Sequence, residues 1–273
     1  MSDVAVLDGV APTGEPSGDV VQYDVVEGVA VITLNRPRAL NAWTMEMGRE
    51  YLRRIDQASA DPEVRVVIVT GAGRGFCSGA DMSLLRDLMA GQPPPPESVR
   101  PDDETEPAVP KLVIAAINGP CVGLGLVRAL YCDVRFITKG TSLSTTFTRR
   151  GLVAEHGVAW LLPRIVGASR ALDLMMSGRA VGAEEAKAIG LVDHVVDDAL
   201  VGAMAYARDI VRNCSPAAMR DVKRQIWGDT TKSLRESIDK AAALMLASLT
   251  RPDVAVGVVA YLEKREPSFP PLV

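Results

Sequence analysis

The sequence has little of what builds metal or nucleic-acid sites. Its 273 residues include two histidines, His156 and His194, and no HExxH or comparable spacing, so we expect no metal site. The net charge of −4 offers no basic field to nucleic acid or to an anionic membrane surface. No apolar run is long enough to cross a bilayer, and no secretory signal opens the chain, so we expect no membrane partner.

Cysteines are also few, and they are scattered. Four occur, with no CxxC pair: Cys77, Cys121, Cys132 and Cys214. Without a secretory signal, such thiols are typical of a reducing compartment, and the sequence therefore predicts a cytoplasmic protein. Cys77 is a candidate nucleophile, although no histidine is paired with it in the sequence.

Apolar residues, in contrast, make up 48% of the chain, which is enough for a large core. Residues 1–19 are rich in glycine, proline, aspartate and serine and are expected to form a flexible tail. Strand and helix patterns alternate over residues 20–200, whereas residues 201–273 are mostly helical. This order predicts an α/β fold with a core at 20–200 and a C-terminal helical region.

The stretch from Val66 to Met82 is the centre of this organisation. A β-branched run ends in glycines and continues into Ser78-Gly79-Ala80-Asp81 and a predicted helix, so a buried strand leads into a turn with available N–H groups. Such a turn can bind a dinucleotide or form half of an oxyanion hole. The first interpretation is disfavoured, because Cys77 stands where the short-chain dehydrogenase pattern needs glycine and no Tyr-x-x-x-Lys pair follows.

A second turn of the same kind spans residues 118–125, Asn-Gly-Pro-Cys-Val-Gly-Leu-Gly. It also follows an apolar strand and opens a predicted helix. Either turn alone would be explained by the tolerance of glycine for positive φ or close packing. Two such junctions together can direct two N–H groups at one carbonyl oxygen, and the pair therefore favours an oxyanion hole.

The order and spacing of several motifs resemble the enoyl-CoA hydratase/isomerase (crotonase) superfamily over residues 20–270. The matching segments are Asn35-Arg36-Pro37, Asn41-Ala42, 76–81, 118–133, Val166-Gly167, 186–192 and 261–269. The resemblance implies a spiral of ββα turns with a helical C-terminal trimerisation region, in a homotrimer or a dimer of trimers. It also implies an acyl-CoA substrate, with coenzyme A entering as part of the thioester and no other cofactor.

The same resemblance implies the site residues. The oxyanion donors would be the backbone N–H groups of Ala80 and Leu124. Substrate and CoA would contact a wider set, in which the two C-terminal residues often come from a neighbouring subunit: Arg38, Ala39, Leu40, Ser78, Asp81, Met82, Gly123, Phe147, Lys264 and Phe269.

The usual acid and base are missing from this pattern. Hydratases of the family use two glutamates, and the corresponding positions hold Val127 and Phe147. One carboxylate remains, Glu155, at a position that resembles the catalytic acid of some isomerases of the family. Without the resemblance, Glu155 would be interpreted as a charge at a helix N-terminus. His156 is expected to be its neighbour rather than a base.

A single carboxylate can move a proton between two carbons while an oxyanion hole holds the enolate. We therefore predict enoyl-CoA double-bond isomerisation with Glu155 as the only acid/base, and hydration as the next candidate. A non-catalytic acyl-CoA-binding homologue and a CoA-thioester hydrolase are the alternatives. Trp160 is expected in the core or the pocket wall. Residues 91–107, proline-rich and acidic, are either a disordered insertion or a mobile flap over the acyl chain.

Overall fold

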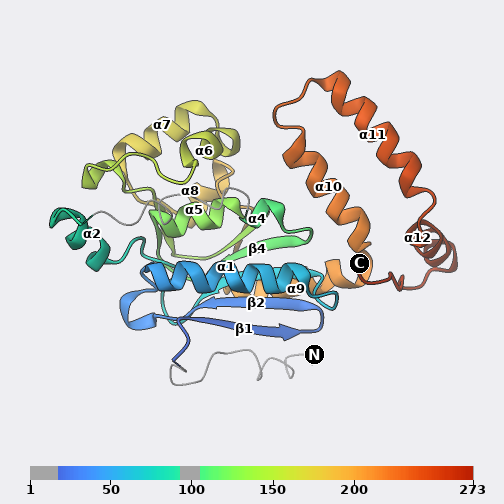
Figure 1. Cartoon of the computed structure of the whole chain (residues 1–273), viewed down its shortest axis with the longest axis horizontal. Helices are drawn as coiled ribbons and strands as arrows, with labels where there is room; N and C mark the ends of the chain where they lie inside the picture. Colours follow the sequence, from blue (N-terminus) through green and yellow to red (C-terminus); the bar gives the residue numbers. More distant parts are fainter. Residues whose placement is uncertain (1–17, 93–104, 273) are drawn as a thin grey trace.

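The structure is a computed structural model that describes residues 18–92 and 105–272 (Figure 1). The predicted tail at 1–19 and the loop at 91–107 fall largely outside these ranges. Within them the chain forms two sheets and a set of covering helices. The predicted α/β class is confirmed.

The main sheet has six strands in the order β1-β2-β3-β4-β6-β9. Only β1 and β2 pair antiparallel, as the predicted hairpin, and the remaining neighbours are parallel. The strands are β1 (Val21–Val26), β2 (Val29–Leu34), β3 (Val66–Gly71), β4 (Leu112–Ile117), β6 (Val134–Thr138) and β9 (His194–Val196).

Both faces of the central strands β2, β3 and β4 are buried, which explains their continuous apolar runs. Side chains alternate between the faces: Val67 and Val69 belong to the core cluster under α1 (Met45–Ala60), whereas Val66 and Ile68 pack with α9 (Ala199–Asn213). Figure 1 shows α1 and α9 near this sheet. The predicted domain boundary at residue 200 thus falls at the start of a helix that packs on the core.

A second, small sheet consists of β5 (Cys121–Val122), β7 (Ser142–Ser144) and β8 (Val181–Gly182). The sequence analysis did not predict it, because strands of two or three residues carry no periodicity. The other helices before α9 are short: α2 (Met82–Met89), α4 (Thr105–Ala108), α5 (Leu124–Tyr131), α6 (Val158–Val166), α7 (Ala168–Ser177) and α8 (Ala183–Ala188), with 3₁₀ turns η1 (Pro37–Ala39) and η2 (Thr148–Arg150).

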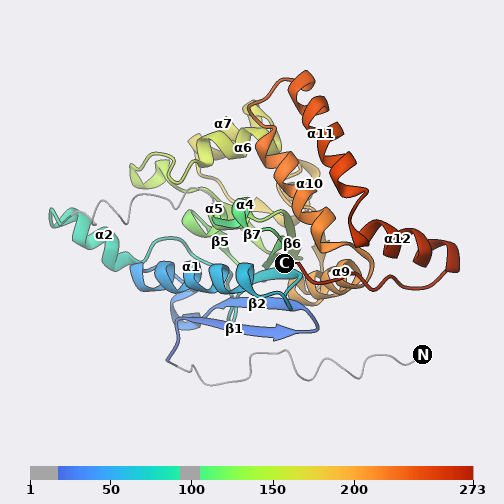
Figure 2. The ribbon, with the colours of Figure 1, turned by 45° about the vertical axis from the view of Figure 1, so that its right-hand side comes forward.

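The last three helices, α10 (Pro216–Gly228), α11 (Leu234–Ser248) and α12 (Pro252–Glu263), extend from the core in both ribbon views (Figures 1 and 2). Lys223 anchors α10: its buried Nζ donates to Glu106 O at 2.7 Å and to Asp133 Oδ2 at 2.7 Å. In the described ranges no single helix is long and apolar enough to cross a membrane; α11 and α12 pass that test only as a pair, which is bent by 76°.

Candidate active site

Both glycine turns follow the carboxyl ends of paired parallel strands, β3 and β4. Two asparagine side chains hold the first turn. Asn118 Nδ2 donates to Gly71 O at 2.8 Å and to Gly73 O at 2.9 Å, and Asn41 Nδ2 donates to Gly75 O at 2.8 Å. The glycines are needed for close approach, because a Cβ on Gly71 would lie 2.2 Å from Gly75 O. The Gly71–Gly75 cluster therefore serves packing, in agreement with rejection of the dinucleotide interpretation.

The two turns also contact each other directly. Val122 N donates to Cys77 O at 2.9 Å, and Cys77 N donates to Pro120 O at 3.2 Å. At the start of α5, a Cβ on Gly125 would lie 2.6 Å from Cys77 Cβ. The first turn of α5 is thus packed onto the Cys77–Ala80 segment, and the predicted pairing of the turns is present.

The backbone fixes the direction of both predicted donors. Gly79 O accepts from Trp43 N at 2.7 Å, and a trans peptide directs its N–H opposite to its C=O, so the Ala80 N–H faces away from Trp43. Gly123 O accepts from Val127 N at 3.1 Å, and the Leu124 N–H projects from the helix N-terminus. Among the described residues neither N–H donates a hydrogen bond, so both remain available to a carbonyl oxygen.

The predicted CoA-contacting residues of the first half of the chain lie together. Ser78 N donates to Leu40 O at 3.0 Å, and Ser78 Oγ donates to Ala39 O at 3.3 Å. Arg38 and Met82, on either side of this contact, are exposed. The loop after β2 and the segment before α2 therefore form one surface beside the Ala80 donor.

Asp81 stabilises this surface through contacts with two neighbouring segments. Its Oδ1 accepts from Ser83 N at 2.9 Å, and its Oδ2 pairs with Arg36 Nη1 at 2.8 Å. These two interactions, the Ser83 hydrogen bond first, lower the pKa of Asp81 to about 2. Asp81 thus caps α2 as an anion and ties it to the Arg36 loop.

The two C-terminal site residues lie elsewhere in the same chain. Lys264 is exposed at the end of α12, and Phe269 packs beside Gly257 with its carbonyl oxygen accepting from Arg65 Nη2 at 2.7 Å. Both ribbon views place α12 and α2 at opposite ends of the molecule (Figures 1 and 2). A contribution of Lys264 and Phe269 from a neighbouring subunit stays a prediction.

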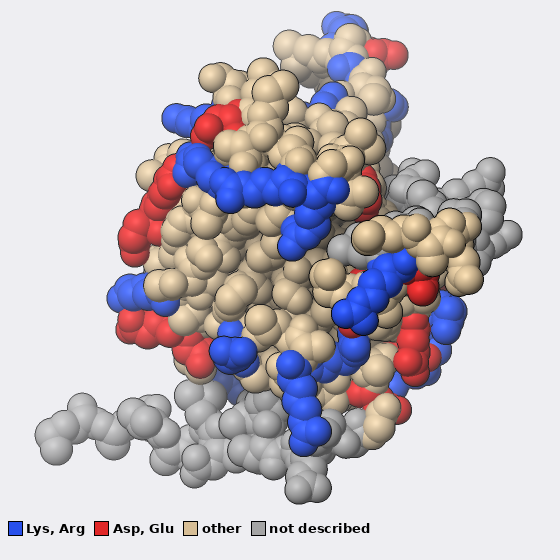
Figure 3. Space-filling model, turned by 90° about the vertical axis from the view of Figure 1, so that its left-hand side faces the viewer, with Lys and Arg blue, Asp and Glu red and all other residues tan. Residues whose placement is uncertain are grey.

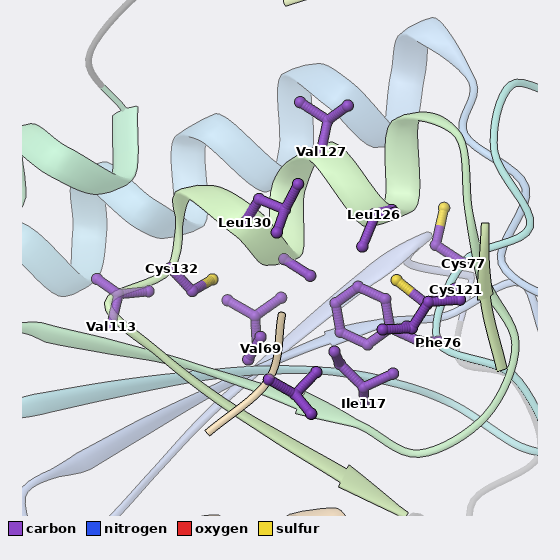
Figure 4. Packing of buried hydrophobic residues seen from close by; sticks show 14 of the residues in the cluster. Val69, Phe76, Cys77, Val113, Ile117, Cys121, Leu126, Val127, Leu130 and Cys132 are labelled. Atoms are coloured by element: carbon purple, nitrogen blue, oxygen red, sulfur yellow. The ribbon is translucent and has the colours of Figure 1, made fainter. Parts of the chain in front are cut away.

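The positions of the usual acid and base are apolar in the structure as well as in the sequence. Val127 is 1% exposed on α5, and Phe147 is 6% exposed before η2. Figure 4 shows Val127 on α5, away from the buried Leu126 and Leu130, which face Phe76 and Val69. Neither position offers a group that can activate water.

Glu155 is half-buried in the loop before α6. Burial raises the pKa of its carboxyl group, and among the described residues that group has no ion pair and no hydrogen bond. An uncompensated, partly desolvated carboxyl group is suited to proton transfer near neutral pH. The alternative is that Glu155 is only a charge at the helix N-terminus. No capping contact supports it, because the residue before α6 is Gly157 and no side chain caps this helix.

A tyrosine connects the Glu155 loop to the oxyanion turn. Tyr131 Oη donates to His156 O at 2.7 Å. Tyr131 lies seven residues after Leu124 in α5, and Val127 lies between them on the same helix face. The Glu155 loop is therefore held against the helix that begins at the Leu124 donor.

Comparison with known proteins decides the family. The family model described as enoyl-CoA hydratase/isomerase matches residues 24–271. The chain belongs to the enoyl-CoA hydratase/isomerase family. It is 40% identical, over 73% of its length and 71% of the relative's, to a probable enoyl-CoA hydratase, echA12, of Mycobacterium leprae. It is 32% identical, over 90% and 96%, to the 1,2-epoxyphenylacetyl-CoA isomerase of Escherichia coli.

Solved structures agree with the fold of this family. A putative enoyl-CoA hydratase/isomerase from Mycobacterium abscessus superposes with a TM-score of 0.85 at 34% identity, over 92% of this chain and all of the other. An enoyl-CoA hydratase from Bacillus anthracis gives 0.85 at 30% identity, over 92% and 99%. The predicted crotonase-like fold is confirmed.

Cys77 is not suited to act as a nucleophile. Cys77 is fully buried, and burial raises the pKa of its thiol to about 11, so almost no thiolate exists at neutral pH. Trp160 is 39% exposed, with the Arg164 guanidinium 3.8 Å from its ring, so the predicted place in the core is wrong, whereas a place in the pocket wall stays a prediction. A ring on the outer side of α6 gains its contact from the arginine one turn away.

The end of the molecule that carries α2 faces the viewer in Figure 3, where cationic side chains surround a central area without charge. Within the described ranges, no group of three or more histidine, cysteine or acidic residues could hold a metal ion.

The sequence analysis missed one feature near the donors, the buried Arg128 of α5. Its signal was a single charge inside the otherwise apolar stretch Leu124–Tyr131.

Proposed function

We propose that this member of the family isomerises the double bond of enoyl-CoA thioesters, with Glu155 as its single acid/base. The observation that carries the proposal is the contrast between three positions. Val127 and Phe147 leave no water-activating pair, whereas Glu155 is a half-buried carboxyl group without a counter-charge in the part of the chain that the structure describes. The relative named 1,2-epoxyphenylacetyl-CoA isomerase supports an isomerase, and the relative named a probable enoyl-CoA hydratase keeps hydration as the second candidate.

In the proposed reaction the thioester oxygen accepts from the N–H groups of Ala80 and Leu124. The Glu155 carboxylate takes a proton from the α carbon of a 3-enoyl thioester, and the electron pair moves onto the thioester oxygen as an enolate. The same proton then returns to the γ carbon, which gives the 2-enoyl thioester. Nothing is added or lost, and no cofactor besides the substrate's own CoA is required.

We further propose that the chain acts as a homotrimer, alone or paired into a hexamer, without nucleic-acid or membrane partners and in the cytoplasm. Its C-terminal helices support the assembly, because they expose many large apolar side chains that a single chain leaves uncovered. They are Val222, Ile226, Leu234, Ile238, Met245, Leu246, Leu249, Val258, Val259, Tyr261 and Leu262. Light scattering after size exclusion should give three or six times the chain mass; a monomer contradicts the proposal.

Product analysis tests the reaction. The protein should be incubated with 3-enoyl-CoA thioesters of several chain lengths and, separately, with the 2-enoyl-CoA thioesters that hydration requires. Isomerisation should leave the mass of the 3-enoyl substrate unchanged while ultraviolet absorption shows conjugation. Gain of one water instead means hydration, release of free CoA means hydrolysis, and binding without conversion means a non-catalytic homologue.

Substitution tests the assignment of Glu155. Glu155→Gln should lower kcat by about 10³-fold, since a positioned acid/base supplies about 10²- to 10⁴-fold. The dissociation constant of a saturated acyl-CoA should change less than about threefold, because CoA binds through other residues. Glu184→Gln, an exposed carboxylate in α8, is the matched control and should leave kcat unchanged. Full activity of Glu155→Gln overturns the assignment.

A further inference from the structure

A cluster of four buried side chains lies between α1, α4 and α5, next to the oxyanion turns. Tyr51 Oη donates to Glu106 Oε1 at 2.6 Å, and Arg128 Nη1 lies 3.6 Å from Glu106 Oε2. The Arg128 guanidinium also lies over two rings, 5.5 Å from the centre of Trp43 and 5.9 Å from that of Tyr51. No part of the proposed reaction uses this cluster.

Arg128 is held in this cluster by an uncommon set of contacts. It is 9% exposed, yet within the described ranges its side chain donates no hydrogen bond, and its buried Nε has no partner. The charge is balanced only by Glu106 and by the faces of the two rings. Its place therefore depends on cation–π contact with two rings at once, and the compact ammonium group of a lysine lacks the broad guanidinium plane that reaches both.

The ring under Arg128 belongs to the residue that orients the first donor. Trp43 N donates to Gly79 O at 2.7 Å, and Trp43 O accepts from Asp81 N at 2.9 Å. The first of these bonds holds the peptide unit that carries the Ala80 N–H. A shift of Trp43 would therefore rotate or displace that donor.

The backbone of Arg128 belongs to the helix that carries the second donor. Arg128 follows Leu124 by four residues, about one turn of α5. One side-chain contact, Arg128 on Trp43, thus joins the element that orients Ala80 to the element that presents Leu124.

We propose that Arg128 is a positioning residue that sets the spacing of the two oxyanion donors through its contact with Trp43. The inference rests on the proposed function only in requiring an acyl-CoA carbonyl between Ala80 and Leu124; it is independent of isomerisation and of Glu155. A misplaced donor weakens stabilisation of the developing oxyanion more than it weakens substrate binding.

Acetoacetyl-CoA is a suitable probe, because its enolate carries the oxyanion and absorbs in the near ultraviolet, so no turnover is needed. The wild-type protein should raise the enolate fraction of the bound probe. Arg128→Lys keeps a cation beside Glu106 and should lower the enolate-to-keto ratio of the bound probe about tenfold. Deleting an oxyanion donor costs roughly 10²-fold or more, and a displaced donor should cost only part of that. The Arg128→Lys variant should lower kcat similarly and leave KM within about twofold.

Arg135→Lys is the matched control. Arg135 is 7% exposed on β6, donates to Leu191 O and Cys132 O, and touches neither donor turn. This variant should lose stability and keep the enolate ratio. Trp43→Leu removes the ring from the other side, and the double variant with Arg128→Lys should lose no more than the larger single effect, because both break the same contact.

The outcomes separate the two proposals. A wild-type protein that does not stabilise the bound enolate overturns the proposed function. If the wild-type protein stabilises the bound enolate, two results overturn the positioning role of Arg128. One is an Arg128→Lys variant with the same enolate-to-keto ratio as the wild type. The other is an Arg135→Lys variant whose ratio falls as far as that of Arg128→Lys. If Arg128→Lys does not fold, Trp43→Leu with the wild-type ratio overturns this role in the same way.

Discussion

The part of the candidate site that we propose polarises the substrate differs in construction from the part proposed to move a proton. The polarising part is backbone, held by Asn41, Asn118 and glycines that approach neighbouring carbonyls, and its two N–H donors do not titrate. The proposed proton-transfer part depends on one titratable side chain, Glu155, while Val127 and Phe147 are apolar. In the proposed reaction, packing therefore sets the polarising part, and one side chain supplies the proton transfer.

The stability of the polarising part should fall when volume is added at a glycine that takes no part in the chemistry. A Cβ on Gly119 would lie 2.1 Å from Arg74 O, a backbone atom that cannot move away as a side chain can. Gly119→Ala should therefore lower the free energy of unfolding by about 3 kcal/mol or more, at the upper end of overpacking effects. Urea unfolding measures the loss.

Gly182→Ala is the control for this substitution, since a Cβ there meets nothing within 4 Å. It should change the free energy of unfolding by less than about 0.5 kcal/mol. Equal stability of the two variants would show that the turns tolerate movement, and the contrast between the two parts of the site would fail.

The contrast also explains what the sequence could predict. Residues such as Asn118, Gly119 and Gly125 are required by backbone geometry, so both turns and their pairing were predictable from residue types and spacing. The two-residue strands β5 and β8 carry no periodic signal and were missed. The cluster of Trp43, Tyr51, Glu106 and Arg128 was missed because it joins residues far apart in the chain.

For Glu155, the sequence could supply only its position within the motif. Its half-burial and lack of a counter-charge depend on how the loop before α6 packs against Tyr131, which no local pattern encodes. Similarly, Trp160 looks like a core residue by type, yet its place on the outer side of α6 exposes it.

The pH dependence of the reaction should follow Glu155. Burial raises the pKa of this carboxyl group above the ordinary value of 4.5, and the base must be ionised to take a proton. We expect kcat/KM to fall as the pH drops, with a midpoint above 4.5, and the midpoint should move if Glu155→Asp retains activity. A pH–rate profile with no acid limb above 4.5 would contradict Glu155 as the base.

The same raised pKa makes a prediction for stability with a definite sign. The native state binds the proton on Glu155 more tightly than the unfolded state does, so this group destabilises the fold as the pH rises through its native pKa. Glu155→Gln should therefore melt slightly higher than the wild type at pH 7, by at most about 2 °C for a half-buried group, and equally at pH 4 or below. A lower melting temperature at pH 7 would indicate a structural role for the carboxylate instead.

The smallest effect is expected from thiol reagents, and it tests whether the polarising part is chemically inert. Burial raises the pKa values of all four thiols, but Cys77, Cys121 and Cys132 are buried, whereas Cys214 is half-buried. With a pKa of about 11 for Cys77, roughly one thiol in 10³ would be ionised at pH 8 even if it were reached. Iodoacetamide at pH 8 should therefore label Cys214 first, by peptide mass spectrometry, while activity is retained. Loss of activity in step with labelling of Cys77 would show that the turn contains a reactive side chain. The proposed contrast between a polarising backbone and a separate reactive side chain, Glu155, would then fail.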